Sequence, residues 1–148
     1  MLRYDYIDLQ DDNMTLDELR SQFVIDDDVK SEKLEALIHK ALPHCVVRKN
    51  GSVEIRRSDL PGKQQVKLVL AARLLASKLD EAILGEVTVE HLSEYTGLPK
   101  GQAAARAKEC MDERFADRSA RGSYKARPLK VEEFLDGLSA TRNFKGVS

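Results

Sequence analysis

The side chains best suited to metal chemistry lie near residue 40, where His39, His44 and Cys45 fall within seven residues. A structural zinc site needs about four such ligands in a tetrahedral arrangement. No fourth ligand with suitable spacing accompanies these three. The three aspartates at 26–28 also lack the glycine and terminal glutamate of a calcium loop. We therefore expect no metal site.

Groups that would catalyse a reaction show no recognisable arrangement. The chain contains no phosphate-binding loop, no dinucleotide-binding glycine pattern, no nucleophile elbow and no HExxH sequence. Its carboxylates show no pairing that would favour acid–base catalysis. We expect a binding protein that is not an enzyme and has no cofactor.

Positive charge is the chemistry that this sequence concentrates. Residues 114–130 hold six bases against one acid, Asp117. The bases are Arg114, Arg118, Arg121, Lys125, Arg127 and Lys130. Residues 1–35 hold eleven acids against four bases, although the whole chain has a net charge of only -1. This asymmetry predicts a basic surface for an anionic partner, and an acidic arm that folds over it or contacts another molecule.

The composition is that of a charge-rich globular protein. A chain of 148 residues can form one compact domain or two very small ones. No segment approaches the roughly 18 apolar residues of a membrane span, and the acidic start differs from the basic start of a signal peptide. We expect a cytoplasmic protein with no membrane contact. Cys45 and Cys110 lie far apart in the sequence, so both are expected to be reduced thiols inside packed elements.

Local signals in the first half predict an α+β fold that is mainly α. Thr15 and Glu18 match a capping box before a short helix over 16–23. Ser31 is the expected N-cap of a second helix that ends at Pro43. Asn50-Gly51 lies between two alternating apolar segments and predicts a β-hairpin with a type I′ turn over 45–57. The apolar residues between 66 and 83 then predict a long central helix.

The second half predicts shorter elements. Thr88 is the expected cap of a helix over 89–95, Gly97 supplies a turn, and Pro99 begins a helix that continues to about 114. The expected inward face of that helix is Ala103, Ala107, Cys110 and Met111. Residues 115–128 are expected to form a loop or a loose hairpin. A short helix follows over 131–138, and the tail from residue 139 is expected to be disordered.

Residues 88–103, with the sequence TVEHLSEYTGLPKGQA, resemble the first helix and turn of the winged helix-turn-helix superfamily. In that superfamily a phrase of the form LAxxTGL marks this position. Here Ser93 is small enough for two helices to approach closely, Gly97 can take the left-handed conformation, and Leu98 can fill the corner. The resemblance covers about residues 66–138 and concerns the fold.

The resemblance implies a DNA-binding protein that could regulate transcription. The second helix of such a motif usually enters the major groove of duplex DNA, and the wing contacts the backbone. Pro99 and Ala105 would face the DNA. The implied nucleic-acid-binding residues are Lys100, Gln102, Arg106, Arg118, Arg121, Lys125 and Arg127. The acids Glu109, Asp112 and Glu113 would repel phosphates unless they point away.

We divide the chain into an acidic arm over 1–28, a helix–β-hairpin–long helix unit over 29–84, and a winged helix-turn-helix domain over 85–148 that shares the long helix. A protein-interaction or scaffold module of a larger complex is the alternative, because many winged helices bind proteins and the fold alone does not choose. A protein partner would then bind the acidic arm or the exposed alanine-rich helix. A homodimer through the N-terminal half is a further expectation.

Overall fold

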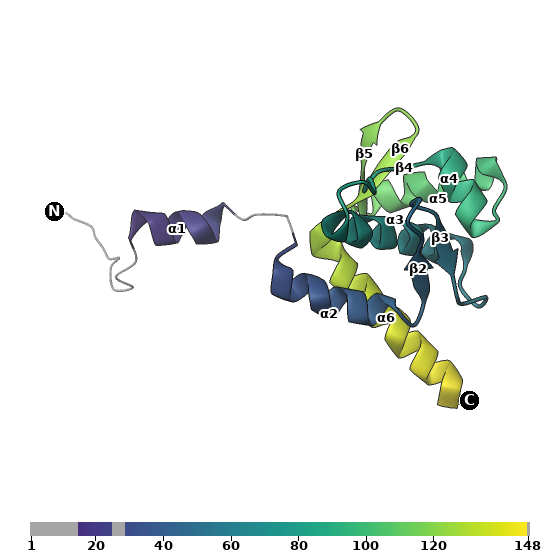
Figure 1. Cartoon of the computed structure of the whole chain (residues 1–148), viewed down its shortest axis with the longest axis horizontal. Coiled ribbons are helices and arrows are strands. Elements are labelled where there is room, and N and C mark those ends of the chain that lie inside the picture. The colour runs from purple at the N-terminus through teal and green to yellow at the C-terminus, as the bar shows by residue number, and fades with distance from the viewer. Residues whose placement is uncertain (1–14, 25–28, 148) are drawn as a thin grey trace.

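The computed structural model describes residues 15–24 and 29–147, with side chains as far as residue 139. Helices dominate these ranges, together with two small antiparallel sheets (Figure 1). The predicted α+β, mainly α fold is therefore confirmed. Residues 1–14 and 25–28 of the predicted arm lie outside the described residues.

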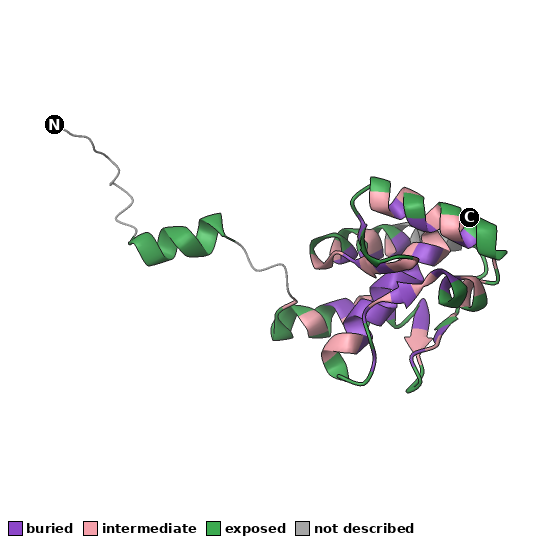
Figure 2. Cartoon of the chain, turned by 90° about the horizontal axis from the view of Figure 1, so that it is seen from above, coloured by how far each residue is buried: buried purple, intermediate pink, exposed green. Residues whose placement is uncertain are grey.

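Helix α1 (Leu16–Phe23) stands apart from the rest of the protein, and none of its residues is buried (Figures 1 and 2). The predicted capping box is present. The Thr15 hydroxyl accepts the Glu18 N–H at 3.1 Å, and the Glu18 carboxylate accepts the Thr15 N–H at 2.8 Å. These two bonds satisfy amides that the first turn of a helix leaves without partners.

Helix α2 (Ser31–Ala41) begins one residue earlier than its predicted cap implies. Lys30 occupies the N-cap position, with no side-chain hydrogen bond, and Ser31 is the first helical residue. The expectation that Ser31 caps this helix was therefore wrong. The helix packs against α6 (Pro128–Val147) through its basic side chains: Lys33 and Lys40 each lie 2.8 Å from the Glu132 carboxylate.

Strands β2 (Cys45–Val47) and β3 (Val53–Ile55) form the predicted hairpin, but its turn differs from the prediction. Gly51 has a positive φ of 91°, but Asn50 does not. Among the described residues other than glycine, a positive φ occurs at Arg114. Asn50 therefore does not adopt the conformation that a type I′ turn needs at both central residues. Instead, the Asn50 side chain accepts the Ser52 N–H at 3.0 Å and closes a longer turn.

Helix α3 (Gly62–Leu79) is the central element, and its middle is buried on every side (Figure 2). It contacts α2, both strands of the first sheet, α4, α5, β6 and α6. The helix starts and ends four residues earlier than predicted, because Pro61 provides its N-cap and the Asp80 carboxylate turns the chain by accepting the Ala82 N–H at 2.9 Å. The expected helical residues Ala82 and Ile83 thus lie in the following loop.

A buried arginine ties this helix to two loops. The Arg73 guanidinium donates hydrogen bonds to the carbonyls of Gly51 at 3.2 Å, Leu84 at 2.8 Å and Glu86 at 3.2 Å. A buried charge is tolerated where its donors find acceptors. The hairpin turn and the loop after α3 are therefore held by one side chain.

The C-terminal half contains β4 (Val87–Thr88), α4 (Val89–Thr96), α5 (Lys100–Asp112), β5 (Ala116–Ala120), β6 (Ser123–Ala126) and α6. Its sheet has the strand order β4-β6-β5, and both pairings are antiparallel. Of the two alternatives for 115–128, the segment forms the hairpin, with a shift of register between Arg118 and Ala120. Strand β4 gives β6 a second pairing partner. The core is a single cluster that includes buried residues from Leu37 to Leu138.

Helix α6 continues to Val147, so the expectation of disorder from residue 139 was wrong. No proline interrupts the sequence after Pro128, and helical hydrogen bonds can therefore continue. The buried Arg57 side chain donates to the Leu138 carbonyl at 3.0 Å and fixes this helix against the first half. Within the described ranges, none of the helices combines the length and the apolar character that crossing a membrane requires.

Candidate nucleic-acid interface

The corner between α4 and α5 is built from short-range hydrogen bonds. The Thr88 hydroxyl caps α4 by accepting the His91 N–H at 3.2 Å. Gly97 ends that helix in the left-handed conformation, with φ 80°, and donates its N–H to the Ser93 carbonyl at 2.9 Å. The Ser93 hydroxyl then reaches across the turn and donates to the Leu98 carbonyl at 2.6 Å. The predicted sharp turn at Gly97 is therefore present.

Leu98 fills this corner as predicted. It is half-buried and packs against the hydrophobic core. Its methyl groups lie so close to the start of α3 that a Cβ on Gly62 would meet them at 3.3 and 3.4 Å. The corner is thus fixed to the central helix.

Helix α5 presents its alanine face to the core. Ala103, Ala107 and Cys110 have 0% exposure, and Met111 is partly buried against them. The helix consequently lies close to α3. Gly101, Gln102, Ala105, Lys108 and Asp112 are all exposed and face away from that contact. The first half of this outer face is small and uncharged, so another surface could approach it closely.

The acids at the end of α5 are largely neutralised. Lys63 and Lys67 from α3 both bind the Glu113 carboxylate, the second at 2.8 Å, and these hydrogen bonds hold the pKa of Glu113 below its usual range. Glu109 pairs with Arg106 at 3.0 Å. Asp112 remains exposed. Of the three acids predicted to oppose phosphate binding, Glu113 is held by the lysines of α3.

The hairpin of β5 and β6 separates the predicted basic residues into two groups. Side chains directly opposite in an antiparallel pair share one face of the sheet, and neighbours along a strand alternate. Arg118 lies opposite the buried Tyr124, whereas Asp117 lies opposite Lys125. Arg127, two residues after Lys125, shares the second face and binds Asp117 at 2.7 Å. Arg118 and Arg127 therefore belong to different faces.

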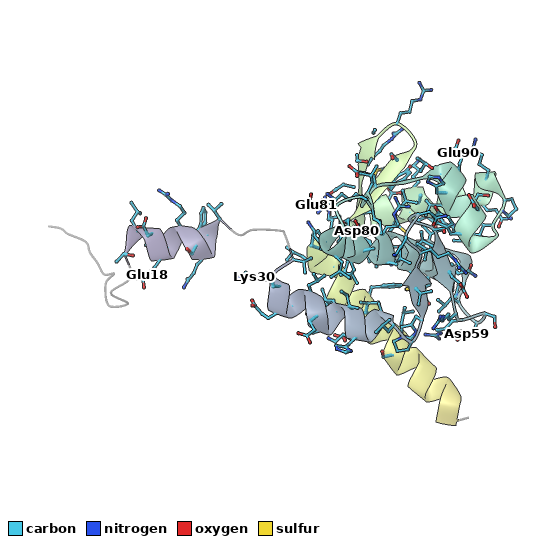
Figure 3. All side chains as sticks on the ribbon, in the orientation of Figure 1. Glu18, Lys30, Asp59, Asp80, Glu81 and Glu90 are labelled. Carbon is cyan, nitrogen blue, oxygen red and sulfur yellow. The ribbon has the colours of Figure 1, made fainter. Side chains whose placement is uncertain are left out.

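Several predicted contact residues are engaged with carboxylates of the protein itself. Lys100 binds Glu90 at 2.9 Å, and this hydrogen bond lowers the pKa of Glu90. Glu90 lies on the outer side of α4 (Figure 3). Arg106 and Arg127 also form ion pairs. These pairs are partly or largely exposed, so each is weak and can exchange for a phosphate.

The remaining predicted residues are more accessible. Arg118 and Arg121 are exposed, and within the part of the chain that the structure describes their guanidinium groups form no ion pair. Arg121 lies in the turn beside Gly122, which has φ 74°. Gln102 is exposed on α5. Lys125 is half-buried, and its Cε lies 3.4 Å from the position of a Cβ built on Gly85.

One basic residue at this surface was missed by the sequence analysis. Lys108 is exposed on the outer face of α5, one turn after Ala105. The positions predicted for α5 already imply its direction, because Lys108 lies two positions before the inward Cys110 and three after the outward Ala105. Lys108 therefore extends the candidate surface along the helix.

The two cysteines are part of the hydrophobic core. Cys45 and Cys110 are buried, free thiols, as predicted, and burial raises the pKa of each to about 12. They therefore stay protonated near neutral pH. Over the described ranges, no group of three or more histidine, cysteine or acidic side chains is placed to hold a metal ion.

Comparison with protein-family models, curated proteins and solved structures finds no match to this chain.

Proposed function

We propose that this protein binds duplex DNA through a winged helix-turn-helix, with α5 in the major groove and the β5–β6 hairpin as the wing. The observation that carries the proposal is the element order from α3 to β6, in which β4 pairs with the far strand of the hairpin. This order and pairing are those expected of a winged helix. A role in regulating transcription is part of the same proposal.

The surface that would contact DNA combines two chemistries. The small outer face of α5 at Gly101 and Ala105 would allow close approach to base edges, and Gln102 can donate to and accept from them. Arg118 and Arg121 would bind phosphates, because both side chains are exposed. Neither has to break an ion pair with a described carboxylate before it binds a phosphate. Strand β5 contacts α5, so Arg118 and the helix belong to adjoining surfaces.

Fluorescence anisotropy with a labelled mixed-sequence duplex, at about 50 and 200 mM salt, tests this proposal. Each phosphate contact releases counterions, so binding should weaken strongly between these two conditions. Replacing Arg118→Ala and Arg121→Ala together should weaken binding to all sequences alike and lower the salt slope by about two. Gln102→Ala should instead reduce the discrimination between sequences.

The matched control replaces two arginines of the other hairpin, Arg48→Ala and Arg56→Ala. Both are exposed and the charge change is the same. This control should retain most of the affinity. Binding that is absent, or that both double variants reduce equally, would contradict a wing contact.

Protein binding is the second candidate, and the exposed apolar side of α1 favours it. Leu16, Phe23 and Val24 are 75%, 90% and 66% exposed. Large apolar side chains gathered on one element are typical of a contact surface.

A further inference from the structure

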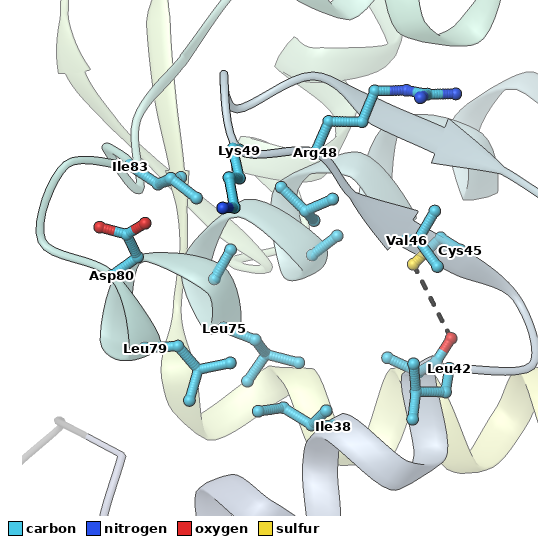
Figure 4. Close-up of a pocket in the computed structure, with 14 residues that line it drawn as sticks. Ile38, Leu42, Cys45, Val46, Arg48, Lys49, Leu75, Leu79, Asp80 and Ile83 are labelled. Carbon is cyan, nitrogen blue, oxygen red and sulfur yellow. Dashed lines mark hydrogen bonds between the residues drawn. The ribbon is translucent and has the colours of Figure 1, made fainter.

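An open apolar groove lies between α2, β2 and the second half of α3 (Figure 4). We name it the α2–α3 groove. Its main hollow has a volume of about 360 Å³, and its lining includes Ile38, Leu42, Val46, Leu75 and Leu79. A second hollow of about 230 Å³ shares Ile38 and Leu79 with it and extends to Leu34. The two hollows together form a trough along α2.

The edges of the α2–α3 groove leave apolar surface in water. Leu42 is 48% exposed on one side and Leu79 is 67% exposed on the other. Figure 4 shows both leucines at the margin, with Leu75 between them. Covering these side chains with another apolar surface is favourable, because it removes them from water.

Helix α1 has the complementary chemistry. Leu16, Leu19 and Phe23 are spaced by three and four residues, so they lie on one side of the helix, and Val24 extends that side. Helices of eight residues are marginal in water without packing partners. The capping box defines where α1 begins, but within the described ranges no residue of α1 is buried. Its apolar side therefore lacks a packing surface.

Two bases, Arg48 and Lys49, and one acid, Asp80, line the main hollow, so its net charge complements an acidic helix. Asp17 and Glu18 lie in the first turn of α1. Arg48 and Lys49 line the β2 end of the groove, and Lys49 extends toward the hollow in Figure 4. Arg48 binds Glu54, whereas Lys49 forms no ion pair with a residue in the described ranges. An acidic helix in the groove would give Lys49 a partner.

We propose that α1 of one copy of this protein docks in the α2–α3 groove of a second copy, and that the exchange is reciprocal. The backbone is extended at Val24 and Lys30, on either side of the link between α1 and α2, and α1 lies clear of its own body. A two-fold exchange fills both grooves with the same contact. The proposal gives the second candidate function a specific partner and does not depend on DNA binding.

Tryptophan fluorescence can report this docking directly, because the chain contains no Trp. In full-length Phe23→Trp protein, the indole should emit at shorter wavelength when α1 is docked. Dilution should shift the emission to longer wavelength while light scattering shows the molar mass falling from dimer to monomer. Adding Leu79→Glu should give a monomer with solvent-exposed emission at every concentration. Leu129→Glu is the matched control, because Leu129 is 60% exposed on α6, and it should leave the dimer intact.

Complementation distinguishes reciprocal exchange from general stickiness. Phe23→Glu disables α1 and Leu79→Glu disables the groove, so each variant alone should be monomeric. A mixture of the two should associate, because one intact α1 then meets one intact groove. A mixture that stays monomeric, short-wavelength emission from a monomer at all concentrations, or solvent-exposed emission from concentrated Phe23→Trp protein would each overturn the proposal. These measurements contain no DNA, so their failure is distinct from failure of DNA binding.

Discussion

Gly97 sets the geometry of the α4–α5 corner through its backbone alone. Its φ of 80° lies in the left-handed region, and a Cβ built there would meet no atom within 4 Å. Any other residue would therefore be strained by conformation without a steric clash. The neighbouring Gly101 also has open space around it, but it lies inside α5 with ordinary helical backbone.

Substituting these two glycines should have opposite effects. We expect Gly97→Ala to lower the free energy of unfolding by about 1 kcal/mol, because alanine must adopt the left-handed conformation. Gly101→Ala should raise it by up to about 1 kcal/mol, because alanine favours helix. Urea denaturation followed by circular dichroism measures both. If both substitutions changed the free energy of unfolding equally, the left-handed conformation of Gly97 would not explain the change.

At the scale of elements, α2 and α6 are joined by a cluster of charges. The Glu132 carboxylate forms ion pairs with Lys33 and Lys40, and the Lys40 ammonium also lies 3.0 Å from the Asp136 carboxylate. Hydrogen bonds from Lys33 and Lys40 lower the pKa of Glu132 from 4.5 to about 2. The ionised carboxylate is therefore favoured in the folded protein.

This pKa gives the contact a defined pH dependence. A carboxyl group whose pKa is lowered by folding stabilises the protein fully above its unfolded pKa. That contribution should decrease as the pH falls from about 4.5 toward 2. The thermal midpoint of the wild type should exceed that of Glu132→Gln near pH 6, and the difference should shrink through this range. A difference that stays constant would mean that Glu132 acts through packing and not through its charge.

At the scale of the whole molecule, charge is divided between the arm and the body. Residues 1–28 carry nine acids and two bases, so the other 120 residues have a net charge of +6. Such a separation lets the arm compete with an anionic partner for the basic surface.

Neutralising part of the arm should therefore strengthen the proposed binding to DNA. We expect Asp26→Asn, Asp27→Asn and Asp28→Asn together to tighten binding about threefold near 50 mM salt, because three repulsive charges are removed. The three substituted residues lie outside α1, so the triple variant keeps the sequence of that helix. The gain should diminish near 200 mM salt, where screening is stronger. Anisotropy titration measures both conditions, and a gain independent of salt would exclude this electrostatic explanation.

The sequence by itself determined the elements whose signals lie within a few residues. The capping box at Thr15, the cap at Thr88 and the turn at Gly97 each depend on hydrogen bonds that span five residues or fewer. The buried face of α5 followed from helical spacing, as Ala103 and Ala107 show. These features were predictable because local backbone preference and packing favour the same structure. The winged helix-turn-helix resemblance and its DNA contacts stay predictions.

Only the tertiary structure decided how distant segments meet. The hairpin over 116–126 belongs to a three-stranded sheet because β4, about 35 residues away, pairs with β6. Arg118 and Arg127 occupy different faces because of the strand register, and Glu113 is held by lysines from α3. The α2–α3 groove likewise arises from three elements. Contacts of this kind depend on which apolar surfaces pack together, and no short stretch of sequence contains that information.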